Sequence, residues 1–120
     1  MMKNNLISII MSCHNGEKYL KMAIHSVLKQ SYNNWELIFW DNFSNDDSAK
    51  IINSFADNRI KYFKSKKKTN LAIARNKAIQ KSKGEFICFL DTDDYWLKDK
   101  LKIQINTIKS NALISVVFCK

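Results

Sequence analysis

The sequence predicts an α/β fold, in which a mostly parallel open sheet carries helices on both faces. Apolar residues switch repeatedly between short continuous runs, typical of strands buried on both faces, and the spacing of helices. Strands that alternate with helices form βαβ units, whose strands pair in parallel. The chain of 120 residues is 46% apolar and has no repeat or linker, so we expect a single domain over 1–120 with its own core.

The first half of the chain holds two strand–helix units. Residues 6–11 form a continuous, β-branched apolar run, which predicts a buried strand. Apolar residues then recur at helical spacing over 19–31. A second apolar run covers 35–40, and Ser44 is suited to cap a helix that ends near Phe55.

The second half repeats this alternation. A short strand is expected over 59–63, followed by a helix over 71–84 that ends on a glycine. The next strand is expected over 85–90, and the next helix over 95–110 has an apolar face. The β-branched run 112–118 predicts a fifth strand, after which the sheet is truncated.

Polar residues follow the first, second and fourth predicted strands, in "SCHNGE", "DNFSND" and "DTDD". Open parallel sheets bind ligands beyond the carboxyl ends of their strands. On an extended chain Asp91 and Asp93 point to the same side, about 6–7 Å apart, and paired carboxylates suit Mg²⁺ or Mn²⁺. The alternative is that Asp93 or Asp94 caps a helix beginning at Tyr95.

The segments "SIIMSCHNGEKYLKMAIHSVLKQSYNNWELIFWDNFSNDDS" and "NLAIARNKAIQKSKGEFICFLDTDDYW" resemble family 2 glycosyltransferases, whose fold is the Rossmann-like GT-A fold. The resemblance covers nearly the whole chain, in order. It implies transfer of a sugar from a nucleotide-diphosphate donor, commonly UDP-linked, with inversion at the anomeric carbon. It further implies a saccharide or lipid-linked acceptor and assistance by Mn²⁺ or Mg²⁺.

The resemblance also implies roles for the residues at the strand ends. The nucleoside is bordered by the loop that contains Cys13, His14 and Asn15. Asp41 and Asn42 match the pair that reads the base and ribose, and Arg75 matches an arginine that reaches the nucleotide. Asp91, Thr92 and Asp93 match the family's Asp-X-Asp motif. In that motif the first carboxylate meets the ribose side of the donor and the last binds the metal. The resemblance thus implies a metal site at Asp91 and Asp93.

Several positions depart from the family pattern. His14 stands where a tyrosine is frequent, and it is either a stacking partner for the base or a loop histidine. Phe43 replaces a frequent glycine, and Asn70 lies near another, where asparagine tolerates positive φ. We expect the general base and the acceptor-binding half beyond Lys120. We therefore expect this chain to bind donor but to transfer sugar poorly, and to self-associate through its last strand.

The net charge of +9 raises the question of nucleic acid. The lysines are spread along the chain, apart from "KSKKK" at 64–68, and arginine occurs only at Arg59 and Arg75. We therefore expect no nucleic-acid partner, but a weak attraction of the basic cluster to anionic lipid. Without a signal peptide or a run of roughly 20 apolar residues, we expect a cytoplasmic protein, peripheral at most to the inner face of the membrane.

Other functions fit the sequence less well. A non-catalytic nucleotide-binding module would share the same site. A receiver domain needs an acidic pair after the first strand, and a haloacid dehalogenase-type phosphatase needs a threonine where Tyr95 stands. A sugar nucleotidyltransferase would need a glycine-rich loop after the first strand. Cys13 beside His14 could suggest a thiol nucleophile, but adjacent residues of a strand point apart.

Overall fold

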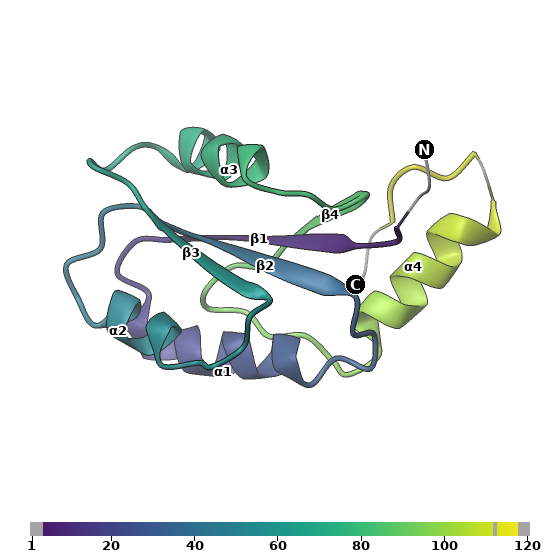
Figure 1. Ribbon diagram of the computed structural model, residues 1–120, viewed down its shortest axis with the longest axis horizontal. Helices are drawn as coiled ribbons and strands as arrows, with labels where there is room; N and C mark the ends of the chain where they lie inside the picture. Colours follow the sequence, from purple (N-terminus) through teal and green to yellow (C-terminus); the bar gives the residue numbers. More distant parts are fainter. Residues whose placement is uncertain (1–3, 112, 118–120) are drawn as a thin grey trace.

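The computed structural model describes residues 4–111 and 113–117, and it confirms the predicted α/β architecture (Figure 1). Four strands form one sheet in the order β3-β2-β1-β4, and every neighbouring pair is parallel. The strands are β1 (Ile7–Cys13), β2 (Trp35–Asp41), β3 (Ile60–Lys64) and β4 (Phe86–Phe89). The helices are α1 (Glu17–Leu28), α2 (Ser48–Asn53), α3 (Leu71–Gln80) and α4 (Lys100–Ser110).

Helices cover both faces of this sheet. Figure 1 shows α3 on one side and α1 and α2 on the other, with α4 at the end of the sheet away from the β3–α3 connection. Side chains alternate along β1, so that Ile9 and Met11 enter the larger core with α1, whereas Ile10 packs with Ala78 of α3. This arrangement explains the continuous apolar run of β1, because both of its faces are buried.

Three helix boundaries differ from the sequence-based expectation, and the first two concern α2 and α3. Ser44 does not cap α2, which begins at Ser48. The amide of Ser44 instead donates to Asp41 Oδ1 (2.8 Å), so the chain completes a turn before the helix starts. Helix α3 ends at Gln80, before the glycine expected to close it. Asn70 has a negative φ of −70° and caps α3, because its Oδ1 accepts from the Ile73 amide (2.9 Å).

The helix expected from residue 95 begins only at Lys100, because the end of α1 binds the preceding segment. Gln30 is 4% exposed, and its Nε2 donates to the Leu97 carbonyl (2.7 Å) while its Oε1 accepts from the Leu101 amide (3.0 Å). The Ser31 amide donates to the Lys98 carbonyl (2.9 Å). An earlier helix start would need the Leu101 amide to donate to the Leu97 carbonyl, and this amide is instead bonded to Gln30.

The predicted fifth strand is wrong for the residues that the structure describes, since 113–117 adopt no strand. A turn at Asn111 replaces it, in which the Ile114 amide donates to the Asn111 carbonyl (3.0 Å). Residues 112 and 118 lie outside the described part of the chain. A β-branched segment forms a strand only where a neighbouring strand offers pairing and packing, and self-association through this segment stays a prediction.

No helix in the described part of the chain combines the length and the apolar composition that crossing a bilayer requires.

Candidate functional site

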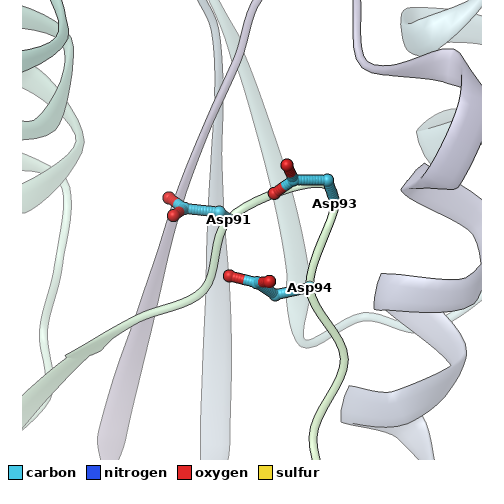
Figure 2. A group of neighbouring side chains, drawn as sticks. All are labelled: Asp91, Asp93 and Asp94. Atoms are coloured by element: carbon cyan, nitrogen blue, oxygen red, sulfur yellow. The ribbon is translucent and has the colours of Figure 1, made fainter.

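The carboxylates of Asp91, Asp93 and Asp94 gather on a turn just beyond β4. Their ligand oxygens all lie within 4.8 Å of one another, and all three side chains are exposed. The amide of Asp94 donates to the carbonyl of Asp91 (3.1 Å), so the segment is a turn and not the extended chain that we expected. Figure 2 shows the carboxylates of Asp93 and Asp94 directed toward the side of Asp91. The turn therefore adds a third carboxylate to the predicted pair.

Arg75 reaches this acidic turn from α3, which lies on the face of the sheet opposite α1 and α2 (Figure 1). It lies on α3, and its Nη2 is 3.2 Å from Asp91 Oδ1. Its guanidinium also lies 5.4 Å from the ring centroid of Phe89, a distance typical of a cation–π contact. Ala74 and Ala78 of α3 are buried, whereas Leu71 is 51% exposed. The structure thus brings together two residues that the sequence singled out 16 positions apart.

Asp41 ends β2 and is fully buried. Its Oδ2 accepts from the Tyr62 hydroxyl (2.6 Å) and its Oδ1 from the Ser44 amide (2.8 Å). Burial, together with the Asp41 carboxylate, raises the pKa of Tyr62, so the phenol remains a donor at neutral pH. Asp41 thus fixes β3 and the β2–α2 loop to one point.

Asn42 is also buried, and its side chain is bonded to the β3–α3 loop. Its Nδ2 donates to the Thr69 carbonyl (2.7 Å), and its Oδ1 accepts from the Thr69 amide (2.9 Å). Its own amide donates to the Cys13 carbonyl (2.6 Å). Both ends of the amide side chain are therefore occupied within the protein.

The end of β1 presents His14 and Asn15 to solvent. Because the Asn42 carbonyl can only accept, His14 Nδ1 donates to it (2.9 Å), and His14 Nε2 lies 3.4 Å from the side-chain amide nitrogen of Asn15. Asn15 has a φ of 53° and its amide donates to Ser44 Oγ (2.9 Å). Cys13 is buried, and this burial raises the pKa of its thiol, so the thiol is a poor nucleophile at neutral pH.

Gly16 and Thr92 connect the β1 end to the acidic turn. A Cβ on Gly16 would lie 2.8 Å from Thr92 Oγ1 and 3.1 Å from Cys13 Sγ, so a larger residue would crowd the junction. The loops after β1 and β4 therefore touch at this glycine. The sequence-predicted residues form one continuous edge of the sheet.

A pocket of about 920 Å³ opens beside the acidic turn. Its walls combine acidic, basic and aromatic side chains, among them Arg75, Phe89, Asp91, Asp93, Asp94, Tyr95, Trp96 and Lys100. A mixed lining of this kind offers hydrogen-bonding groups for polar parts of a ligand and flat surfaces for a ring.

Sequence reasoning missed three residues of this edge. The sequence offers Asp94 as a helix cap, but α4 begins six residues after it, at Lys100, with Asp99 as its N-cap. Tyr62 and Thr69 hold Asp41 and Asn42. Alternation along β3 places Tyr62 on one face, but no local signal indicates a partner 21 residues earlier.

The chain is similar in sequence to bacterial glycosyltransferases. It is 42% identical over 110 residues to the UDP-Glc:alpha-D-GlcNAc-diphosphoundecaprenol beta-1,3-glucosyltransferase WfgD of Escherichia coli, covering 92% of this chain and 44% of that protein. It is 39% identical over 105 residues to the E. coli enzyme WfaP, which has the same named activity, covering 88% of this chain and 42% of WfaP. The chain thus spans less than half the length of these relatives.

A solved structure has the same fold. The crystal structure of S. aureus TarS 1-349 in complex with UDP-GlcNAc superposes with a TM-score of 0.80 at 28% identity, covering 91% of this chain and 32% of the TarS 1-349 chain. The sequence profile of Glycosyl transferase family 2 matches residues 8–119. The chain belongs to glycosyltransferase family 2.

Proposed function

We propose that the carboxyl edge of this sheet binds a UDP-sugar and serves its transfer to a saccharide or lipid-linked acceptor. The observation that carries the proposal is the acidic turn of Asp91, Asp93 and Asp94 with Arg75 beside it. Two relatives are named as enzymes that use UDP-Glc and a diphosphoundecaprenol-linked sugar, and TarS was solved with UDP-GlcNAc. The same chemistry suits this chain, because a nucleoside diphosphate leaving group gains negative charge as the glycosidic bond breaks.

The acidic turn suits a divalent cation by its donor set. Three carboxylates whose oxygens lie within 4.8 Å of one another offer only hard ligands, and their exposure leaves room for diphosphate oxygens. Asp93 and Asp94 would hold Mn²⁺ or Mg²⁺, with Asp91 shared between the cation and Arg75. When bound, the cation would act as a Lewis acid toward the charge that develops on the leaving diphosphate.

Arg75 supplies positive charge to the same region without a metal. Its side chain is 36% exposed, and its Nη2 is bonded to only one carboxylate oxygen. A guanidinium has further N–H groups, which can bond to a phosphate in the bidentate geometry that arginine favours. We therefore assign Arg75 to the diphosphate.

The nucleoside would lie over the ends of β1 and β2. His14 and Asn15 are exposed there and can contact the base directly. Asp41 and Asn42 are buried and bonded to Tyr62 and Thr69, so we assign them to shaping the floor of this subsite. Direct bonding of either side chain to the base would require those protein hydrogen bonds to open.

Calorimetry with UDP, in Mn²⁺ and in chelator, tests the proposal. We expect binding to be stronger with Mn²⁺, and we expect Asp93→Asn to remove most of this difference. Glu85→Gln is the matched control, because it removes one exposed carboxylate from the opposite end of β4. Binding of UDP that is equal in Mn²⁺ and chelator would refute the metal role, and no binding in either would refute the donor site.

A further inference from the structure

The connection between β3 and α3 exposes a basic cluster at the carboxyl edge of the sheet. Lys64, Lys66, Lys67 and Lys68 are all exposed. Within the described residues, none of these four lysines makes an ion pair with a carboxylate. Their charge is therefore available to a partner outside the protein.

Large apolar side chains flank this basic cluster. Phe43 in the β2–α2 loop is 50% exposed, and Leu71 and Ile73 in the first turn of α3 are 51% and 43% exposed. The bonds between Asn42 and Thr69 join the two loops, and Phe43 follows Asn42 directly while Leu71 follows two residues after Thr69. Figure 1 shows both loops at the same end of the sheet, on the left of the view.

Hydrogen bonds of the buried Ser65 fix the backbone of the basic cluster. Ser65 is buried, its amide donates to the Asp41 carbonyl (2.8 Å), and its hydroxyl donates to the Lys67 carbonyl (2.6 Å). Phe43 has a φ of 61°, an unusual conformation for a bulky residue, and it directs a large apolar ring to solvent. Lysines and apolar groups are thus presented together by a fixed edge.

We propose that this basic-apolar edge, formed by Lys64, Lys66, Lys67, Lys68, Phe43, Leu71 and Ile73, docks on an anionic lipid bilayer. Lysines attract anionic headgroups, and apolar side chains beside them enter the interfacial region, which is the pattern of peripheral membrane surfaces. A nucleic acid fits the edge less well, since Leu71 and Ile73 cannot stack on bases and the cluster lacks arginine. The bilayer would then face the same edge that carries the candidate donor site.

Cosedimentation of the chain with vesicles tests this proposal without any nucleotide. We expect binding to mixed phosphatidylglycerol–phosphatidylcholine vesicles, little binding to pure phosphatidylcholine, and weakening as salt rises. The triple variant Lys66→Gln, Lys67→Gln, Lys68→Gln should bind the anionic vesicles at least about tenfold more weakly. The matched control replaces three other exposed lysines by glutamine, in the variant Lys83→Gln, Lys102→Gln, Lys109→Gln. This control variant should retain most of the binding to the anionic vesicles.

The apolar part is tested by Phe43→Asn combined with Leu71→Gln, since asparagine accepts the positive φ of Phe43. We expect this variant to lose several-fold in vesicle binding at unchanged charge. Equal losses in the two triple-lysine variants would overturn the proposal, because net charge alone would then explain binding. Tighter binding to a mixed-sequence single-stranded RNA than to vesicles, with the same lysine dependence, would overturn it in favour of nucleic acid. Because donor binding is measured separately by calorimetry, failure here and failure of the proposed function are distinguishable.

Discussion

The carboxylate of Glu36 accepts a 2.6 Å hydrogen bond from the hydroxyl of Ser8, its direct partner across β2 and β1. The same carboxylate accepts from the Lys83 amide (2.6 Å) and from Lys61 Nζ (3.0 Å). The Ser8 hydroxyl in turn accepts from the Gly84 amide (2.8 Å). This buried network ties the segment between α3 and β4 to the middle of the sheet. It therefore fixes where β4 begins, and with it the strand that leads to the acidic turn.

Replacing Glu36 by Gln should destabilise the protein by about 1–3 kcal/mol, because the amide oxygen can replace only Oε2, which accepts from Ser8 and Lys83, and the amide NH2 then faces the Lys61 ammonium where Oε1 accepted. Glu36 is 3% exposed, so water cannot replace the lost acceptor, although the partly exposed Lys61 contributes less than a fully buried ion pair would. Urea unfolding would measure the loss, with Glu85→Gln as the exposed control. Equal stabilities of the two variants would contradict the network's role.

The contribution of Glu36 should also depend on pH. Burial by itself raises the pKa of Glu36, but bonds from Ser8, Lys83 and Lys61 outweigh burial and hold the pKa below its ordinary value. Such a depressed pKa means that the stabilisation is complete above the ordinary glutamate pKa of about 4.3 and is lost as pH falls through the folded-state pKa. The difference in melting temperature between wild type and Glu36→Gln should therefore be constant near neutral pH and shrink below about pH 4. A difference in melting temperature that grows on acidification would show that folding raises the pKa of Glu36 instead of lowering it.

The two glycines should respond differently to alanine. A Cβ on Gly84 would lie 2.5 Å from Ser8 Oγ, 2.7 Å from Ser8 N and 2.8 Å from the Leu6 carbonyl, so backbone must move and β4 must separate from β1. We expect Gly84→Ala to cost about 2–3 kcal/mol of stability. A Cβ on Gly16 mainly meets the Thr92 side chain, which can rotate, so we expect Gly16→Ala to cost less. Urea unfolding of both variants decides this, and a larger loss for Gly16→Ala would contradict it.

The sequence predicted the four strands well because each is an uninterrupted apolar run whose burial is local in origin. It also predicted that the polar residues after the strands meet at the carboxyl edge, since that position follows from strand order and parallel pairing, and the structure brings them together there. Side-chain hydrogen bonds, one set long-range and one local, account for the late starts of two helices. Gln30 delays α4, and the Asp41–Ser44 bond delays α2. The cap alternative for Asp94 does not hold, because α4 starts later, and the turn leaves Asp94 with the other two carboxylates.

Arg75→Ala should weaken UDP binding about tenfold while changing stability by no more than about 1 kcal/mol. The ion pair with Asp91 is exposed, with side chains 36% and 57% accessible, so its removal costs the fold little. Lys77→Ala is the matched control, because it removes one exposed positive charge from the same helix. Calorimetry and thermal unfolding give the two readouts. A large loss of stability at unchanged UDP affinity would show that Arg75 is structural.

Asp94→Asn should weaken binding of Mn²⁺ as strongly as Asp93→Asn does. The oxygens of both residues reach the same region as those of Asp91, and Asp91 already shares its charge with Arg75, which leaves Asp93 and Asp94 as the unshared carboxylates. Each neutral amide removes one anionic ligand from a set of three, and cation affinity depends on ligand charge. Electron paramagnetic resonance of free Mn²⁺ measures this binding without nucleotide, and Glu85→Gln again serves as the control. A normal Mn²⁺ affinity for Asp94→Asn, beside a large loss for Asp93→Asn, would restrict the site to the Asp91 and Asp93 pair that the sequence first indicated.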